Sequence, residues 1–136
     1  MVKIIAKHSE KNMYKDALEE CLVAYNDTVG PKDGWKFVGF YALNEQDKLV
    51  GGVQGAFEWD WLMLKQLWVA KRQNGLGTKL LLKAEEYAKK HNKTGVILDT
   101  LEFQAKSFYE KHGYEVFGVV DKCAGKFKRY FMKKAF

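Results

Sequence analysis

Apolar residues recur at helical spacing in three stretches of the chain. Following Ser9, a candidate N-cap, the first stretch predicts a helix on the stripe Tyr14, Ala17, Leu18, Cys21, Leu22 and Tyr25. The second predicts a helix packed closely on a sheet, because its positions follow an i, i+4, i+7, i+11 spacing: Gly77, Leu81, Ala84 and Ala88. The third predicts a helix over residues 104–113 that ends on Gly113, a suitable C-cap.

Other segments carry the pattern of β-strands. Residues 61–69 are nearly all apolar, as expected of a central strand covered on both faces. Further strands are expected over residues 2–7, 36–44, 48–59, 94–100, 114–120 and 126–134. Three glycines in the third of these segments suggest a bulge or a close approach of backbone. The whole pattern predicts one mixed α/β domain, α+β-like, over residues 1–136.

Composition narrows the class of protein. A chain of 136 residues that is 47% hydrophobic can bury a sizeable core. No run approaches the roughly 18 apolar residues of a membrane span, and the first residues lack the apolar segment of a signal peptide. Cys21 and Cys123 lie far apart without metal-ligand spacing, so we expect unpaired thiols, no metal and a cytoplasmic protein.

Charge is divided unevenly between the two halves of the chain. Residues 1–68 hold 8 Lys and Arg against 10 Asp and Glu, whereas residues 69–136 hold 15 against 7. A basic half suits an anionic ligand and a mildly acidic half suits a cationic one. A solvated lysine-rich surface explains the same numbers, so charge alone does not identify a ligand.

The stretch KRQNGLGTKLL, residues 71–81, joins the central strand to the second predicted helix. Gly75 and Gly77 carry no side chain to block the backbone N–H groups, and Arg72 lies at the mouth of the loop. Such amides, together with the helix dipole, can bind a phosphate or pyrophosphate. The order Gly-Thr-Lys does not fit a Walker loop, and Leu80 stands where a dinucleotide fingerprint needs a third glycine.

Two short motifs in this half resemble those of one family. RQNGLG (residues 72–77) matches the R/Q-x-x-G-x-G/A signature that follows the central strand in the GNAT superfamily of acyl-CoA-dependent N-acetyltransferases. AKSFYEKHGY (residues 105–114) is similar to a second family element, an alanine, a tyrosine four residues on, and Gly-Phe/Tyr. The resemblance runs from about Leu49 to Lys134. It implies the GNAT fold, a central twisted mixed β-sheet of about six to seven strands flanked by helices.

The resemblance also implies acetyl-CoA as co-substrate. The coenzyme pyrophosphate is then expected on the loop residues Arg72, Gln73, Asn74, Gly75, Leu76, Gly77 and Thr78. The pantetheine arm is expected between strands 61–69 and 94–100, where it would pair like an added strand with the backbone of Leu67, Trp68 and Val69. Phe108 completes the expected cofactor-binding set.

The implied reaction is direct attack of an amine on a thioester, which needs a proton acceptor, an oxyanion donor and an acid for the thiolate. Tyr109 matches the family's tyrosine acid by position, and the alternative is a core aromatic. Met63 stands where many members have a glutamate base. Glu58 and Asp60 lie just upstream and are the nearest candidates for the base, although both also fit exposed turn residues.

Three charged residues fit this pattern less well. Lys65 interrupts the apolar central strand, and nothing in the sequence explains it. Glu102 stands where many family members have an asparagine that contacts the cofactor, and a carboxylate is a poor neighbour for an anionic ligand. Asp99 fits either an anchor for the acceptor or a cap for the next helix.

The acceptor is expected to be a primary amine, carried by a small molecule or a peptide. The acidic first half and four aromatic residues predict a pocket for a cationic, partly apolar amine, formed by Trp35, Phe57, Trp59 and Trp61. The alternative is that these aromatics belong to the core.

The sequence thus predicts an acyl-CoA-dependent N-acyltransferase that transfers acetyl from acetyl-CoA to a primary amine. A catalytically decayed acyl-CoA-binding module is the first alternative, motivated by the missing glutamate. A basic nucleic-acid-binding domain is the second, and it is disfavoured because the lysines form no recognisable nucleic-acid-reading motif. We expect no membrane or nucleic-acid partner. Residues 114–134 offer an edge for a homodimer, but the sequence leaves the oligomeric state open.

Overall fold

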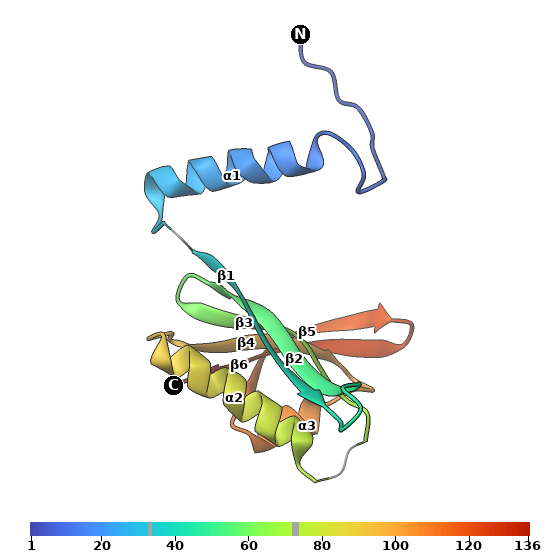
Figure 1. Ribbon diagram of the computed structural model, residues 1–136. Coiled ribbons are helices and arrows are strands. Elements are labelled where there is room, and N and C mark those ends of the chain that lie inside the picture. Colours follow the sequence, from blue (N-terminus) through green and yellow to red (C-terminus); the bar gives the residue numbers. More distant parts are fainter. Residues whose placement is uncertain (33, 72–73) are drawn as a thin grey trace. The chain divides into compact units, whose positions relative to one another are not determined.

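The computed structural model describes residues 1–32, 34–71 and 74–136, and its elements are shown in Figure 1. The chain divides into two compact units, Met1–Asp33 and Gly34–Phe136.

The first unit contains helix α1 (Lys15–Val29). The strand predicted over residues 2–7 is wrong, because those residues carry no strand in the described range 1–32. A strand needs a neighbour that satisfies its backbone hydrogen bonds, and this range offers none.

Helix α1 also starts later than predicted. Ser9 is not its N-cap, because the Ser9 hydroxyl oxygen accepts a hydrogen bond from the N–H of Lys11, at 3.2 Å. Asn12 Oδ1 instead accepts from the N–H groups of Tyr14 and Lys15, at 2.9 and 3.1 Å. An Asn side chain just before the helix therefore satisfies backbone donors of its first turn.

The second unit is a six-stranded sheet, counted over its described residues, with strand order β1-β2-β3-β4-β6-β5. The strands are β1 (Trp35–Leu43), β2 (Leu49–Glu58), β3 (Trp61–Val69), β4 (Gly95–Leu101), β5 (Glu115–Ala124) and β6 (Phe127–Ala135). Neighbours pair antiparallel, except that β3 and β4 pair parallel. Helix α2 (Leu76–Lys90) makes the crossover between these two, and α3 (Lys106–Lys111) follows β4. The predicted mixed α/β fold is confirmed.

Helix α2 covers one face of this sheet (Figure 1). Its predicted apolar stripe is confirmed, because Leu81, Ala84 and Ala88 are fully buried. They pack in one core with Leu62 of β3 and Val96 of β4. The small residues of the stripe let the helix approach the sheet closely, which is why their spacing was informative in the sequence.

Lys65 is the extra residue of a β-bulge in β3. Gln66 pairs with Gln54, but Leu64 pairs with Gly55, so Lys65 has no partner in the β2–β3 register. A bulge of this kind inserts one residue and shifts the alternation of side chains. The bulge therefore explains how an exposed lysine sits in an apolar strand without burying its charge.

The face away from α2 carries polar side chains across three strands. The Tyr41 hydroxyl donates to Gln54 Oε1 at 2.7 Å, and the Gln54 amide donates to Gln66 Oε1 at 2.9 Å. Successive side chains of a strand point to opposite faces, so these three lie opposite buried core residues such as Val53. The two faces of the sheet thus differ: one packs on α2 and the other presents hydrogen-bonding groups.

Candidate active site

The central strands β3 and β4 separate part-way along their length. Their parallel pairing comprises Trp61 with Gly95, Leu62 with Val96, and Met63 with Ile97. Within the described residues, β3 continues from Leu64 to Val69 without a strand partner on this side. Backbone groups on such an edge can hydrogen-bond an extended ligand as they would a strand.

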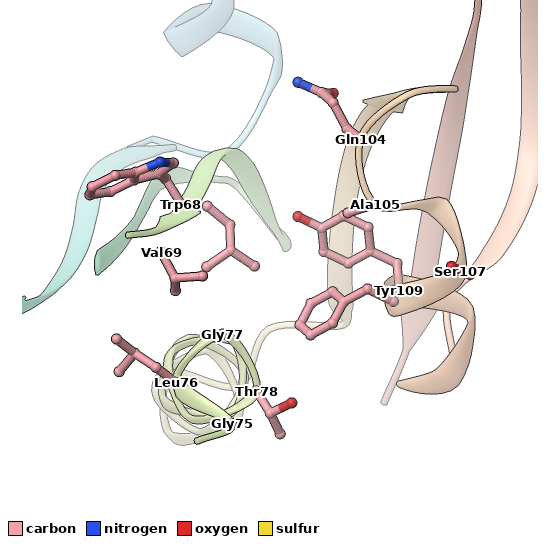
Figure 2. A pocket seen from close by; sticks show the side chains of 12 residues that line it. Trp68, Val69, Gly75, Leu76, Gly77, Thr78, Gln104, Ala105, Ser107 and Tyr109 are labelled. Carbon is pink, nitrogen blue, oxygen red and sulfur yellow. The ribbon is translucent and has the colours of Figure 1, made fainter. Parts of the chain in front are cut away.

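A cleft of about 390 Å³ lies where the strands have parted. Its walls come from the end of β3, the start of α2 and the segment after β4, and Figure 2 shows their side chains around one space. The lining residues are Leu67, Trp68, Val69, Gly75, Leu76, Gly77, Thr78, Gln104, Ala105, Ser107, Phe108 and Tyr109. The volume lies in the range of small-molecule sites, roughly 300–1,000 Å³.

Most of the predicted cofactor-binding residues line this cleft, together with the predicted acid Tyr109. Asn74 instead lines an adjoining hollow with Lys71 and Lys79. Arg72 and Gln73, also predicted, lie outside the described residues. Sequence reasoning did not assign Gln104, Ala105 and Ser107 to the site, although Ala105 belongs to the motif that identified Tyr109.

The N-terminus of α2 presents open backbone donors to the cleft. Lys79 N–H donates to the Gly75 carbonyl at 3.0 Å, so the N–H groups of Leu76, Gly77 and Thr78 precede the first intrahelical bond. The first turn of α2, which the structure describes in full, contains no acidic residue that would compete for these N–H groups. Lys79 also lies in this first turn, so no carboxylate of the turn opposes the positive N-terminal end of the helix dipole.

The two glycines at this end have different physical roles. Gly75 precedes the helix at φ +66°, a left-handed conformation that strains other residues, although a Cβ there would meet nothing within 4 Å. A Cβ on Gly77 would lie in the cleft, 3.6 Å from the Phe108 ring and 4.0 Å from Val69 Cγ1. Gly75 shapes the turn, and Gly77 keeps the cleft free of a side chain at the helix end.

Tyr109 projects from α3 into the cleft. Figure 2 shows its hydroxyl pointing across the space towards β3, where Trp68 and Val69 lie. The side chain is 8% exposed and packs edge-on against Phe108 and Tyr114. Burial, with a smaller contribution from the charge of Asp99, raises the pKa of Tyr109 to about 12. The phenol is therefore protonated at neutral pH and can donate a proton inside the cleft.

The two candidate bases do not reach this cleft. Glu58 ends β2 and pairs with Trp61 at the start of β3, and Asp60 lies in the turn between them. The Asp60 carbonyl accepts a hydrogen bond from Thr94 N–H, at 2.6 Å. A strand rises about 3.3 Å per residue, so Asp60 lies roughly 23 Å from Leu67 along β3. The geometry gives the proposed base role of Glu58 and Asp60 no support.

The aromatic pocket predicted for the acceptor is also not formed at the cleft. Phe57 is 3% exposed and stacks on Tyr87 of α2, so it belongs to the core. Trp35 and Trp61 lie at the β1–β2–β3 end that carries Glu58, and Trp35 is largely exposed. The pocket was predicted because these residues are close in sequence. In the structure, the alternation of side chains and the direction of the strands separate the rings from the cleft.

Glu102, at the position where the resemblance implies an asparagine that contacts the cofactor, is hydrogen-bonded within the sheet. Its N–H donates to the Lys128 carbonyl at 2.8 Å, and its Oε1 accepts from the Lys128 N–H at 3.1 Å. Asp99, on β4, forms an ion pair with Arg129 of β6, with 2.7 Å between Oδ1 and the terminal guanidinium nitrogen. Asp99 and Glu102 thus contact different residues of β6.

Comparison with known proteins identifies the family. A model of the Acetyltransferase (GNAT) family matches residues 7–114. The chain belongs to this family. The predicted family and the predicted acetyltransferase class are confirmed.

Two relatives and two solved structures illustrate the GNAT similarity. Blasticidin-S acetyltransferase of Streptomyces morookaense is 38% identical over 79 residues, 56% of this chain and 58% of that relative. Acetyltransferase Atu2258 of Agrobacterium fabrum is 32% identical over 104 residues, 75% of this chain and 76% of that relative. A crystal structure of an acetyltransferase from Bacillus cereus superposes with TM-score 0.86 at 29% identity, covering 98% of both chains. The structure of aminoglycoside 6'-acetyltransferase type Ii has TM-score 0.64 at 26% identity, covering 73% of this chain and 68% of that one.

None of the helices in the described part of the chain is both long and apolar enough to span a bilayer.

Proposed function

We propose that this GNAT protein transfers the acetyl group of acetyl-CoA to a primary amine of a small cationic molecule. The observation that carries the proposal is the cleft between β3 and β4, which has helix-terminal N–H donors at one side and a protonated tyrosine at the other. Those two features match the two chemically different parts of the donor, an anionic pyrophosphate and a thioester.

The residues of the cleft fit acetyl-CoA in three ways. The N–H groups of Leu76, Gly77 and Thr78 suit the pyrophosphate, since donors and dipole both favour an anion. The unpaired edge of β3 suits the two amides of the pantetheine arm, which can hydrogen-bond like a strand. The apolar walls suit the arm's methylene groups.

The chemistry then takes place beside Tyr109. The amine nitrogen attacks the thioester carbonyl carbon, and the carbon–sulfur bond breaks. The Tyr109 hydroxyl protonates the departing thiolate and regains a proton from the attacking nitrogen. The net change is ammonium plus acetyl-CoA to amide, CoA thiol and one proton.

The acceptor class rests on the relatives. One of them is named a blasticidin-S acetyltransferase, and a solved neighbour is named an aminoglycoside 6'-acetyltransferase. We infer a small-molecule amine of that antibiotic type as the acceptor, with a peptide amine or a lysine side chain as the alternative.

The test is an acetyl-CoA assay with release of free thiol as the readout. The panel contains blasticidin S, an aminoglycoside with a 6'-amine, a peptide with a free α-amine and a lysine-containing peptide. Turnover of at least one amine is expected. Binding of acetyl-CoA without turnover of any of them would favour the catalytically decayed module.

A matched glycine pair tests the donor site in the same samples. Saturation with acetyl-CoA at about 100 times its Kd should stabilise the native protein by about 2.7 kcal/mol and raise its Tm. Gly75→Val should remove most of that rise, since the turn before α2 would be distorted. Gly125→Val is the control, because Gly125 has a similar φ of +58° and equally open surroundings in the β5–β6 turn. A full acetyl-CoA shift in Gly75→Val would reject the loop as the pyrophosphate site.

A further inference from the structure

The proposed reaction lacks a proton acceptor, because Glu58 and Asp60 lie at the wrong end of β3. Asp99 is a carboxylate at the right end. Ile97 is the last β4 residue paired with β3, so Asp99 lies two positions beyond the point where the strands part. Leu98 and Thr100 are buried, so alternation directs Asp99 to the face away from α2, where its side chain is 32% exposed.

Arg129 holds this carboxylate in an uncommon way. Its Nε donates to Asp99 Oδ1 at 2.9 Å, and its terminal nitrogen contacts the same oxygen at 2.7 Å. A fork-to-fork arginine pair would use both carboxylate oxygens. Here Oδ2 has no hydrogen-bond partner among the residues that the structure describes.

The orientation of Arg129 is itself supported. The guanidinium carbon lies 5.3 Å from the centre of the Phe131 ring, on the same strand. Phe131 is in register with Asp99 across the β4–β6 pair. The carboxylate is therefore held at one oxygen, while the other is available to a ligand beyond the point where β3 and β4 part.

The nucleophile needs such a group. An alkylamine with a pKa of about 10 is almost entirely ammonium at neutral pH, and only the neutral amine can attack. Asp99 is also close enough to Tyr109 for its charge to act on the phenol. A carboxylate on β4 and a phenol on α3 could serve the two proton transfers of the reaction.

We propose that Asp99 binds the acceptor ammonium through Oδ2 and takes its first proton, with Arg129 as a positioning residue. This inference rests on the proposed acetyl transfer. The proton passes from nitrogen to Oδ2 and then to water, and the freed lone pair attacks the thioester carbon. The second nitrogen proton leaves when the carbon–sulfur bond breaks, which restores the proton that Tyr109 has given to sulfur.

The test compares two acceptors in two Asp→Asn variants. Asp99→Asn keeps an oxygen for Arg129 but removes the charge, so kcat/KM for the best cationic amine of the panel should fall at least about 30-fold. The KM for acetyl-CoA should stay within about twofold. Asp121→Asn is the control, because Asp121 lies exposed on β5 with only an ion pair to Lys128, at 3.9 Å. Asp121→Asn should have the same kcat/KM for the cationic amine and the same KM for acetyl-CoA as the native protein.

Aniline provides the decisive arm, because it is a neutral amine that needs no ammonium site. Its enzyme-dependent acetylation by Asp99→Asn should stay within about threefold of the native rate. If Asp99 were merely structural, the substitution would lower the acetylation rates of both acceptors by the same factor. Equal losses, or an unchanged kcat/KM for the cationic amine, would overturn the assignment.

Two further results separate the inference from the proposed function. If the native protein binds acetyl-CoA but acetylates no amine, the proposed function fails and the inference falls with it. If Asp99→Asn does not fold, Asp99→Glu is measured, because it keeps the charge while moving the carboxylate by about one bond length. Its KM for the cationic amine should stay within about threefold and its kcat should fall at least about fivefold. A native kcat would contradict the role in proton transfer.

Discussion

The two ends of strand β3 differ in how they pair with the neighbouring strands. At its start, Trp61, Leu62 and Met63 pair with β2 on one side and β4 on the other. At its end, Leu67, Trp68 and Val69 pair with β2 alone and line a cleft. The change occurs around the bulge at Lys65. A central strand can thus serve as core in one half and as a binding edge in the other.

Hydrogen bonds from neighbouring segments close the first end. Thr94 N–H donates to the Asp60 carbonyl, and Phe136 N–H donates to the Thr94 carbonyl, at 2.6 and 2.9 Å. The Lys93 ammonium donates to the Trp59 carbonyl at 2.7 Å. Backbone groups that are satisfied in this way are not available to a ligand, so the closed end supplies stability and the open end supplies binding.

The largest expected effect concerns the open end. Tyr109→Phe should lower turnover by about 10² to 10⁴, equivalent to about 3 to 5 kcal/mol of barrier, because the thiolate loses its proton donor. The ring remains, so the Tm and the Kd for acetyl-CoA should change little. Because the pKa of Tyr109 is raised to about 12, its ionisation should not reduce the native rate below about pH 11. Near-native turnover by the variant would make Tyr109 only a core aromatic.

The next effect compares the same substitution at both ends. A Cβ on Gly95, at the closed end, would collide with the Lys134 carbonyl and approach the Trp61 ring to 2.7 Å. Gly95→Ala should therefore lower the free energy of unfolding by about 2 to 4 kcal/mol in urea titrations. Gly77→Ala, at the open end, should not destabilise the protein but should weaken acetyl-CoA binding. Equal losses of stability in the two variants would remove the distinction between the ends.

The smallest effect is the pH dependence of stability. Burial raises the pKa of Tyr109 to about 12 and also raises the pKa of Tyr114, whose hydroxyl donates to Glu85 at 2.7 Å. The folded state thus keeps protons that the unfolded state loses above about pH 10. Each buried phenol should therefore lower the free energy of unfolding by up to about 1.4 kcal/mol per pH unit as the pH rises above 10.

Urea titrations between pH 8 and 12 measure this slope, with Tyr109→Phe as the control. The variant should lose about 2 kcal/mol less than the native protein between pH 10 and 12, because Tyr109 with a pKa of about 12 is already half ionised in the folded state at the upper limit. The same slope in both proteins would show that Tyr109 ionises freely.

Local patterns allowed part of this structure to be predicted. The stripe on α2 and the loop glycines were readable because helix packing and turn dihedrals depend on residues close in sequence. Nine of the twelve residues that line the cleft were expected from the family resemblance, whereas Gln104, Ala105 and Ser107 were not. The assignment of Glu58 and Asp60 as bases gains no support from the geometry, since closeness to β3 in sequence does not state which end of an extended strand a residue occupies.

Long-range pairing explains what could not be predicted. The bulge at Lys65 is defined by the register between β2 and β3, and the free oxygen of Asp99 is defined by Arg129 on β6. Neither the register between β2 and β3 nor the contact of Asp99 with Arg129 can be recognised from the local sequence. The strand expected over residues 2–7 had a suitable pattern, but the described part of its unit offers no pairing neighbour.

Residue-resolved hydrogen exchange, with and without acetyl-CoA, tests the central claim most directly. Trp61, Leu62 and Met63 are already paired on both sides, so the ligand should change their amide exchange little. Those amides of residues 64–69 that point away from β2, and the first amides of α2, should exchange at least about tenfold more slowly when acetyl-CoA is bound. Protection confined to other strands, with no change at these amides, would contradict the assignment of the open end of β3 as the donor site.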